Sequence, residues 1–343
     1  MPQWCCYRGN PQHTGCVSSI PPLKGHIKWT YSTEETFHHA PTLAGNILYA
    51  VSDRCIYAIE TEKGTLLWKY PSEGIYSPIV VDKTVYFGGK NGLLYALDCL
   101  DGTEKWTYST EGEIKTSPAV LNRHIYIGAG DRFYDLELHT GKERWIFNAD
   151  YEICSSPVVF GGIVFFGAGN IFYAVDARRG RKRWAYRTKI PIYSSPALHS
   201  GCIYLSAGYL YALDIINGAR KWITEIEGDE ITETPVVTES SIFIASKSFM
   251  TEINKTAGVL YSIDAATGSR QWAFFSWDNI TSPAVVDNFM YLGAGDGKIY
   301  ALDIRNGLQK WCCEVDTRAF SSPAAGDGCV FIGGNEGKIY AIT

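Results

Sequence analysis

Residues 96–106 read Ala-Leu-Asp-Cys-Leu-Asp-Gly-Thr-Glu-Lys-Trp, and the same arrangement returns at residues 262–272 and 301–311. Each copy begins with a small residue, has an Asp two positions later and a Gly four positions after the Asp, and ends on a Trp. The Gly can adopt a positive φ, the Asp can accept hydrogen bonds from turn amides, and the Trp offers a large apolar face. The stretch therefore predicts a turn between two strands that docks a neighbouring repeat, with the small residue leaving room for a Trp.

This docking motif recurs along the chain with a period of about 39 residues. Its tryptophans are Trp29, Trp68, Trp106, Trp145, Trp184, Trp222, Trp272 and Trp311. A proline, in most copies preceded by Ser or Thr, recurs in step at Pro41, Pro78, Pro118, Pro157, Pro196, Pro235, Pro283 and Pro323. Two copies vary: Glu60 replaces the Asp in one, and Asp135 and Glu137 replace the small residue and the Asp in another. Repeats of this length are typical of propeller blades.

Each repeat contains short apolar segments separated by turn residues, such as 290–292 and 299–302 on either side of Asp296-Gly297, and helical periodicity is absent. We therefore predict an all-β fold, an eight-bladed β-propeller with four antiparallel strands per blade. The last repeat is split, since residues 339–343 complete a third strand and residues 25–33 supply the fourth. Pairing of these two segments would close the ring and remove two exposed sheet edges.

The motif resembles that of the quinoprotein, or PQQ-like, propeller family, whose docking turn reads Ala-x-Asp-x-x-Thr-Gly-x-x-x-Trp. Seven copies cover most of the chain, and Trp4-x-x-x-Arg8-Gly9-Asn10-Pro11-Gln12-His13-Thr14-Gly15 resembles the lead-in of many non-enzymatic members. In the enzymatic members, the resemblance implies a vicinal disulfide near the quinone and a calcium ion bound by acidic and amide side chains at the channel mouth. WD40 and Kelch propellers fit worse, because their characteristic dipeptides are missing.

The composition indicates one soluble globular domain over residues 1–343, with a lead-in (1–24), a closing strand (25–33) and an insertion at about 247–258. The net charge of -5 is small, so we expect no nucleic acid as partner. No apolar run is long enough for a membrane span, and no signal peptide is visible. Ten cysteines, mostly within expected strands, favour a reducing, cytoplasmic location over a disulfide framework.

Two Cys-Cys pairs raise the question of redox chemistry. Cys312-Cys313 directly follows a docking Trp on an expected outer strand, and Cys5-Cys6 precedes the first blade, so neither is expected to face the central axis. His38 and His39 precede the first inner strand, and adjacent strand residues point to opposite faces, which disfavours a shared metal. No nucleophile elbow, phosphate loop or zinc motif occurs. We therefore predict no catalytic, cofactor-binding or metal-binding residues.

Charge divides the expected propeller into two faces, because inter-blade connections and second-to-third strand turns share one end of a four-stranded meander. The connections are mainly acidic, and the candidate interaction residues on them are Glu34, Glu35, Glu111, Glu113, Asp150, Glu152, Glu227, Asp229 and Glu230. The insertion lies on this same face, and insertions on one face of a repeat array often mark its binding side. The opposite face is basic, with a cluster at Arg178–Arg183 for which an anionic partner is the alternative to simple solvation.

These patterns favour a non-catalytic scaffold or sensor that binds a protein partner, which the acidic face predicts to be basic. Two alternatives stay open: a PQQ-dependent quinoprotein oxidoreductase, and a small-ligand sensor that uses the central channel. A second interpretation of the insertion, as a tolerated loop extension without a binding role, also stays open.

Overall fold

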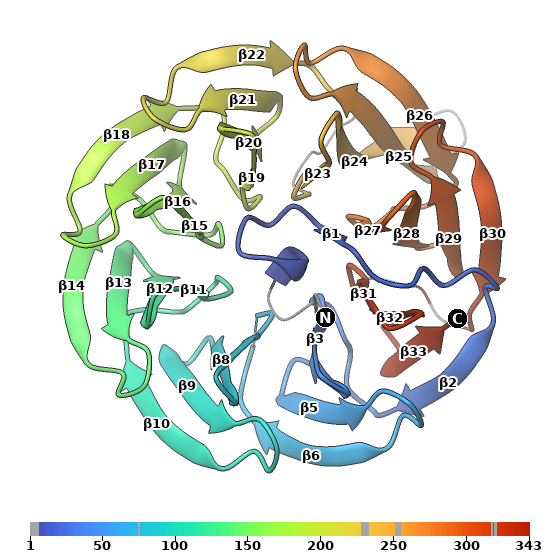
Figure 1. Cartoon of the computed structure of the whole chain (residues 1–343), viewed down its shortest axis with the longest axis horizontal. Coiled ribbons are helices and arrows are strands. Elements are labelled where there is room, and N and C mark those ends of the chain that lie inside the picture. The colour runs from blue at the N-terminus through green and yellow to red at the C-terminus, as the bar shows by residue number, and fades with distance from the viewer. Residues whose placement is uncertain (1–6, 75, 228–232, 251–254, 317, 319–320) are drawn as a thin grey trace.

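The computed structural model describes residues 7–343 except 75, 228–232, 251–254, 317 and 319–320. Eight antiparallel sheets stand around a central axis like the blades of a propeller (Figure 1). The all-β, eight-bladed architecture predicted from the repeat is therefore confirmed. No helix among the described residues has the length and hydrophobicity that crossing a bilayer requires.

Each blade has four strands, and in each blade the innermost strand is named first and the outermost last. Blades 1 to 4 are β3 (Thr42–Ala44), β4 (Ile47–Val51), β5 (Cys55–Glu60) and β6 (Leu66–Pro71); β7 (Ile79–Val81), β8 (Thr84–Gly88), β9 (Leu93–Asp98) and β10 (Glu104–Ser109); β11 (Ala119–Leu121), β12 (His124–Ala129), β13 (Arg132–Glu137) and β14 (Glu143–Asn148); and β15 (Val158–Phe160), β16 (Ile163–Ala168), β17 (Ile171–Asp176) and β18 (Lys182–Arg187). Blades 5 to 8 are β19 (Ala197–His199), β20 (Cys202–Ser206), β21 (Leu210–Asp214) and β22 (Arg220–Thr224); β23 (Val236–Val237), β24 (Ser241–Met250), β25 (Lys255–Asp264) and β26 (Arg270–Ser276); β27 (Ala284–Val286), β28 (Phe289–Ala294), β29 (Lys298–Asp303) and β30 (Gln309–Glu314); and β31 (Ala324–Gly326), β32 (Cys329–Gly333), β33 (Lys338–Ile342) and β2 (Ile27–Ser32).

Blade 8 closes the ring with strands from both ends of the chain. β2 pairs antiparallel with β33, and Trp29 lies opposite Ala341. The predicted pairing of the N-terminal segment with the C-terminal repeat is confirmed. Figure 1 shows β2 at the rim beside β33, where it covers the strand edge that β33 would otherwise expose.

The docking motif joins each blade to the next. A Cβ on any of the eight motif glycines would lie 2.5–2.8 Å from the Trp ring of the preceding blade, as at Gly102 against Trp68 and Gly218 against Trp184. These glycines also have positive φ. The close Trp ring and the backbone conformation therefore each favour Gly at these positions. The indole N–H of Trp68 donates to the carbonyl of Cys99 at 3.1 Å, and five other docking tryptophans make the equivalent bond to the next turn in the ring. Trp184 Nε1 has no partner among the described residues.

The motif Asp organises its own turn, as expected. Asp98 Oδ1 accepts the amide of Leu100 at 2.9 Å, and Asp264 Oδ1 accepts those of Ala266 and Thr267. The exception is blade 3, where Asp135 occupies the small-residue position. This carboxylate is fully buried, and its Oδ1 lies 2.8 Å from Nδ1 of His124.

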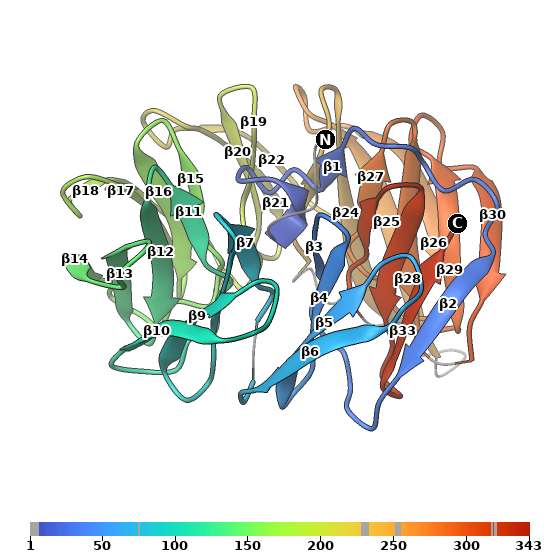
Figure 2. The same cartoon turned by 60° about the horizontal axis from the view of Figure 1, so that its bottom comes forward.

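The lead-in enters the central channel, an arrangement that the sequence did not predict. β1 (Cys16–Val17) adds in parallel to β27, while the carbonyls of Gln12 and Thr14 accept the amides of Leu198 and Val237. The 3-10 turn η1 (Tyr7–Gly9) lies close to the axis in both Figure 1 and Figure 2. Residues 7–15 therefore plug the channel from one end.

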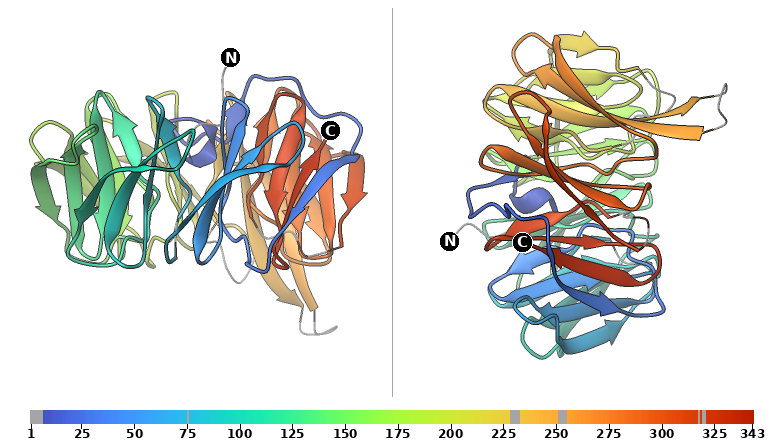
Figure 3. Two further views of the ribbon diagram at one scale, coloured as in Figure 1. Left: turned by 90° about the horizontal axis from the view of Figure 1, so that it is seen from below. Right: turned by 90° about the vertical axis from the view of Figure 1, so that its right-hand side faces the viewer.

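The two faces of the ring are distinct. The lead-in face carries the first-to-second and third-to-fourth strand turns, and the amide of Gly328 in one such turn donates to the carbonyl of Ile20. The hairpin face carries the inter-blade connections and the second-to-third strand turns. The β24–β25 hairpin projects from it, on the side away from the N-terminus (Figure 3).

Candidate functional site

The mouth of the channel on the hairpin face is ringed by the Ser/Thr-Pro steps. The amide of Ser117 donates to Ser156 Oγ at 2.9 Å, the amide of Ser156 to Ser195 Oγ at 3.0 Å, and the amide of Ser195 to Thr234 Oγ1 at 3.2 Å. Each hydroxyl thus satisfies a backbone amide of the preceding blade. These serines hold the inner strands in register around the axis and are not placed as nucleophiles.

The lead-in closes the floor of this mouth. Tyr7 contacts Thr234 through a 3.0 Å bond between their hydroxyl groups. The Arg8 side chain is fully buried and donates to the carbonyls of Thr234 at 3.0 Å and Pro283 at 3.3 Å. The remaining cavity has a volume of about 220 Å³. The channel is therefore a shallow cup and not a passage through the ring.

His38 and His39 both line this cup, contrary to the expectation that they would point to opposite faces. They precede β3, which begins at Thr42, so strand alternation does not apply to them. Burial and the neighbouring His38 lower the pKa of His39 to about 4, and its ring packs on Tyr76 at 4.6 Å between centroids. His39 is therefore neutral at pH 7. No metal-binding group of three His, Cys, Asp or Glu side chains occurs within the described part of the chain.

The cup has no activated nucleophile among its described lining residues. Burial, and then the carboxylate of Glu152, raise the pKa of the Cys154 thiol, which keeps it protonated near neutral pH. Cys312 and Cys313 lie on the outer strand β30, as expected, far from the axis. Cys5-Cys6 falls outside the described residues.

A quinone tricarboxylate is the cofactor that this fold class suggests, and the cup does not fit it. The one Lys or Arg among its described lining residues is Lys115, which is already ion-paired with Glu152 at 2.7 Å and Glu113 at 3.5 Å. Glu233 adds a further carboxylate to the lining of the cup. The three carboxylates of such a quinone would lose their hydration in the cup and find too little positive charge there to compensate. The lining therefore does not fit this cofactor.

The candidate interaction residues are gathered on the hairpin face, but ion pairs offset part of their charge. Glu111 pairs with Arg132 at 2.6 Å, Glu152 with Lys115, and Glu227 with Arg270 at 3.7 Å. Glu35 accepts a hydrogen bond from Ser52, Asp150 accepts one from Tyr173, and Glu34 is exposed. Asp229 and Glu230 lie outside the described residues. The negative potential of this face is weaker than a count of charges implies.

The insertion lengthens β24 and β25, the second and third strands of blade 6. The sequence had placed it in the turn between these two strands. β24 and β25 have ten residues each and pair as far as Met250 with Lys255. The third-to-fourth strand pairing ends at Gly258 and Ser276. The three residue pairs beyond this point project roughly 10 Å at about 3.3 Å per residue. The base is fixed by Ser246, whose hydroxyl donates to the carbonyl of Glu227 at 2.9 Å.

The exposed aromatic side chains on the hairpin face were not identified from the sequence. Trp277, directly after β26, is 62% exposed and packs edge-on against Phe275 at 5.2 Å. Tyr151 and Tyr193 in two other inter-blade connections are 47% and 58% exposed. Trp277 breaks the docking period, which was the one signal in the sequence that could have singled it out.

The fold and the docking turns together define an eight-bladed propeller of the PQQ-like class. The model of the family described as outer membrane protein assembly factor BamB matches residues 13–116, 91–272 and 248–343. The chain belongs to this family. No curated protein sequence matches it.

Solved structures share the fold at low sequence identity. Quinohemoprotein alcohol dehydrogenase from Comamonas testosteroni superposes with a TM-score of 0.86 at 14% identity, over 99% of this chain and 80% of that one. BamB from Moraxella catarrhalis gives 0.75 at 14% identity, over 92% and 98%. The computationally designed protein Ika8 gives 0.78 at 18% identity, over 95% and 99%. An enzyme, an assembly factor and a designed protein thus share this architecture. These similarities therefore show the fold alone.

Proposed function

We propose that the chain is a non-catalytic scaffold that docks a protein partner on its hairpin face. The observation that carries this proposal is Trp277, a largely exposed indole at the base of a hairpin that projects from the ring. Exposed Trp and Tyr side chains are enriched at the centres of protein interfaces, where they bury much area at little entropic cost. Burial of Trp277 by a partner would remove an otherwise unfavourable apolar exposure.

The surroundings of Trp277 supply the other parts of an interface. Tyr151 and Tyr193 add apolar area, and the exposed carboxylates of Glu34 and Glu227 add negative charge at the rim. A basic partner would be steered toward this face, and its association would slow as salt screens the charges. The projecting hairpin also offers backbone edges beyond the sheet, to which an extended peptide could add.

We also propose a reducing compartment, which the eight free thiols among the described cysteines support. The scaffold proposal predicts no PQQ-dependent turnover, because the one Lys or Arg among the described lining residues of the cup, Lys115, is already paired with carboxylates. A quinoprotein oxidoreductase would instead show quinone absorbance and calcium-dependent dye reduction after incubation with PQQ.

Affinity capture from the native host with three baits tests the proposal. The baits are the unaltered chain, Trp277→Ala, and Phe160→Ala, which removes another exposed aromatic residue from the lead-in face. The unaltered and Phe160→Ala baits should retain the same partner, and Trp277→Ala should lose it while its circular dichroism and melting temperature stay unchanged. Equal retention by all three baits would remove the hairpin face as the docking surface.

A further inference from the structure

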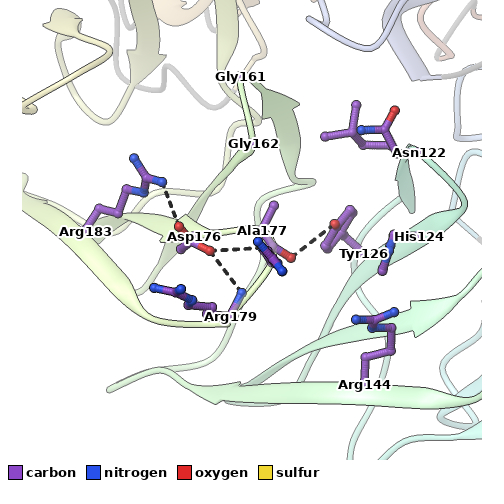
Figure 4. A pocket seen from close by; sticks show the side chains of 12 residues that line it. Asn122, His124, Tyr126, Arg144, Gly161, Gly162, Asp176, Ala177, Arg179 and Arg183 are labelled. Carbon is purple, nitrogen blue, oxygen red and sulfur yellow. Dashed lines mark hydrogen bonds and ion pairs between the residues drawn. The ribbon is translucent and has the colours of Figure 1, made fainter.

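A cavity of about 560 Å³ opens on the lead-in face between blades 3 and 4. Arg144 comes from blade 3, and Arg178, Arg179 and Arg183 come from blade 4 (Figure 4). The equivalent groove between blades 8 and 1 has only about 30 Å³, and its charged lining residues are Lys28, Glu62 and Asp327, of which Lys28 and Glu62 form an ion pair. The same architectural position is therefore large and rich in arginine at one junction and nearly filled at another, where the basic residue already has a carboxylate partner.

Arg144 breaks a charge pattern that four other blades follow. The residue before the docking Trp pairs with the motif Asp of its own blade in four cases: Lys105 with Asp98 at 3.0 Å, Arg183 with Asp176 at 2.7 Å, Lys221 with Asp214 at 3.6 Å and Lys310 with Asp303 at 3.2 Å. In blade 3 the motif acid is Glu137, whose carboxylate instead accepts the hydroxyl of Thr140. Within the described chain, no carboxylate lies within ion-pairing distance of Arg144, which leaves its charge for a ligand.

Arg178 and Arg179 are also available. Their backbone amides donate to Asp176 Oδ1 at 3.1 and 3.0 Å, which fixes the turn, while neither guanidinium forms an ion pair with a described residue. Asp176 is the one acidic side chain that lines the cavity, and Arg183 neutralises it. Three guanidinium groups thus line the cavity from two blades without an ion pair to a described carboxylate. The buried carboxylate of Asp135 acts on Arg144 through its charge but is already bonded to His124.

The turn at Gly161-Gly162 keeps the cavity open. Both residues have positive φ, and a Cβ on either would find no atom within 4 Å. The corresponding turns of blades 7 and 8 begin with Asp287 and Asp327 at nearly the same φ of 51° and 52°. Blade 4 therefore lacks the carboxylate that those blades carry at this point.

The remaining lining suits an organic group next to an anion. Leu121, Tyr126 and Ala177 supply apolar surface, and Tyr126 uses its hydroxyl to bond the carbonyl of Ala177. His124 also lines the cavity, and because Asp135 engages its Nδ1, only Nε2 remains for a ligand. The volume is several times that of a phosphate group alone.

We propose that this cavity binds a small organic phosphate, with Arg144, Arg178 and Arg179 holding the phosphate and the apolar surface holding the organic part. Guanidinium groups match phosphate oxygens in charge and in bidentate geometry. The site lies on the face opposite to the proposed docking surface and is independent of it.

Isothermal titration with phenyl phosphate, inorganic phosphate and sulfate at constant ionic strength tests the proposal. Phenyl phosphate should bind most tightly, because only it fills both parts of the cavity. Arg144→Gln and Arg179→Gln should each weaken its binding about tenfold, whereas Arg220→Gln, an exposed arginine of the same face outside the cavity, should change it by less than about twofold.

A matched pair at position 161 separates charge from shape. Gly161→Asp copies the turn that begins at Asp327, and Gly161→Asn adds the same volume without charge, as at Asn122 with its φ of 50°. The Asp variant should lose about tenfold in affinity and the Asn variant less than about threefold. Equal affinities for sulfate and phenyl phosphate, or indifference to Arg144 and residue 161, would overturn the proposal. So would binding to phosphatidic acid vesicles without binding of the soluble probes, which would assign the arginines to a lipid surface.

Discussion

Replacement of Gly218 by Ala should separate the two reasons for glycine in the docking turn. At this position φ is +70°, and an added Cβ would lie 2.5 Å from Cε3 of Trp184 in the preceding blade. Gly201 in the same blade has a φ of +73°, yet a Cβ there would meet no atom within 4 Å. Gly201→Ala therefore measures backbone strain alone, about 1 kcal/mol for a non-glycine residue in this region. Gly218→Ala adds the cost of overpacking, about 1–3 kcal/mol, and should lose about 2–4 kcal/mol in all.

Urea unfolding followed by circular dichroism provides the measurement, with the free energies of unfolding compared at equal m-values. Adding Trp184→Leu to each variant completes the test, because it should recover part of the loss in Gly218→Ala and none in Gly201→Ala. If Gly218→Ala and Gly201→Ala were equally destabilised, blade docking through the Gly–Trp contact would be refuted.

Three further predictions concern other parts of the ring. Burial raises the pKa of Asp135 from 3.8 to about 6, so its ionised form costs stability above that pH and the cost fades as pH falls toward 3.8. Asp135→Ala should therefore raise the free energy of unfolding by about 1–3 kcal/mol at pH 8, with a smaller gain at pH 4 in parallel urea titrations; a loss at pH 8 would contradict this. Deletion of residues 1–30 removes the channel plug and three of the five β2–β33 residue pairs, and should lower the melting temperature and cause self-association by light scattering, whereas an unchanged monomer would refute the closing role. Titration with PQQ and calcium should give no submicromolar binding, and quinone-dependent turnover of an alcohol or aldose would show the scaffold proposal to be wrong.

The repeat in the sequence predicts most of the fold. The spacing of Trp68, Trp106 and their equivalents predicted the number of blades, the split eighth blade and the position of the insertion, because each depends on contacts that recur at a fixed period. The channel plug was not predictable in this way. Arg8 and Tyr7 make contacts with Thr234 and Pro283 that occur once and join residues more than 200 positions apart.

The sites depend on departures from the repeat, which a pattern alone does not interpret. Asp135 was recognised as a substitution, but its bond to His124 and the absence of an ion pair at Arg144 depend on the three-dimensional arrangement. The acidic face was predicted from charge counts, while the ion pairs of Glu111 and Glu152 that weaken it depend on side-chain geometry. The exposure of Trp277 likewise follows from its place beyond the last paired residue of β26.

Hydrogen–deuterium exchange of the chain, free and bound to the partner captured by the unaltered bait, tests the scaffold proposal most directly. We expect slower exchange in the β24–β25 hairpin and in the connections around Tyr151, Tyr193 and Trp277, with no change in the turns of the lead-in face. Protection confined to the lead-in face, with the hairpin exchanging as in the free protein, would contradict it.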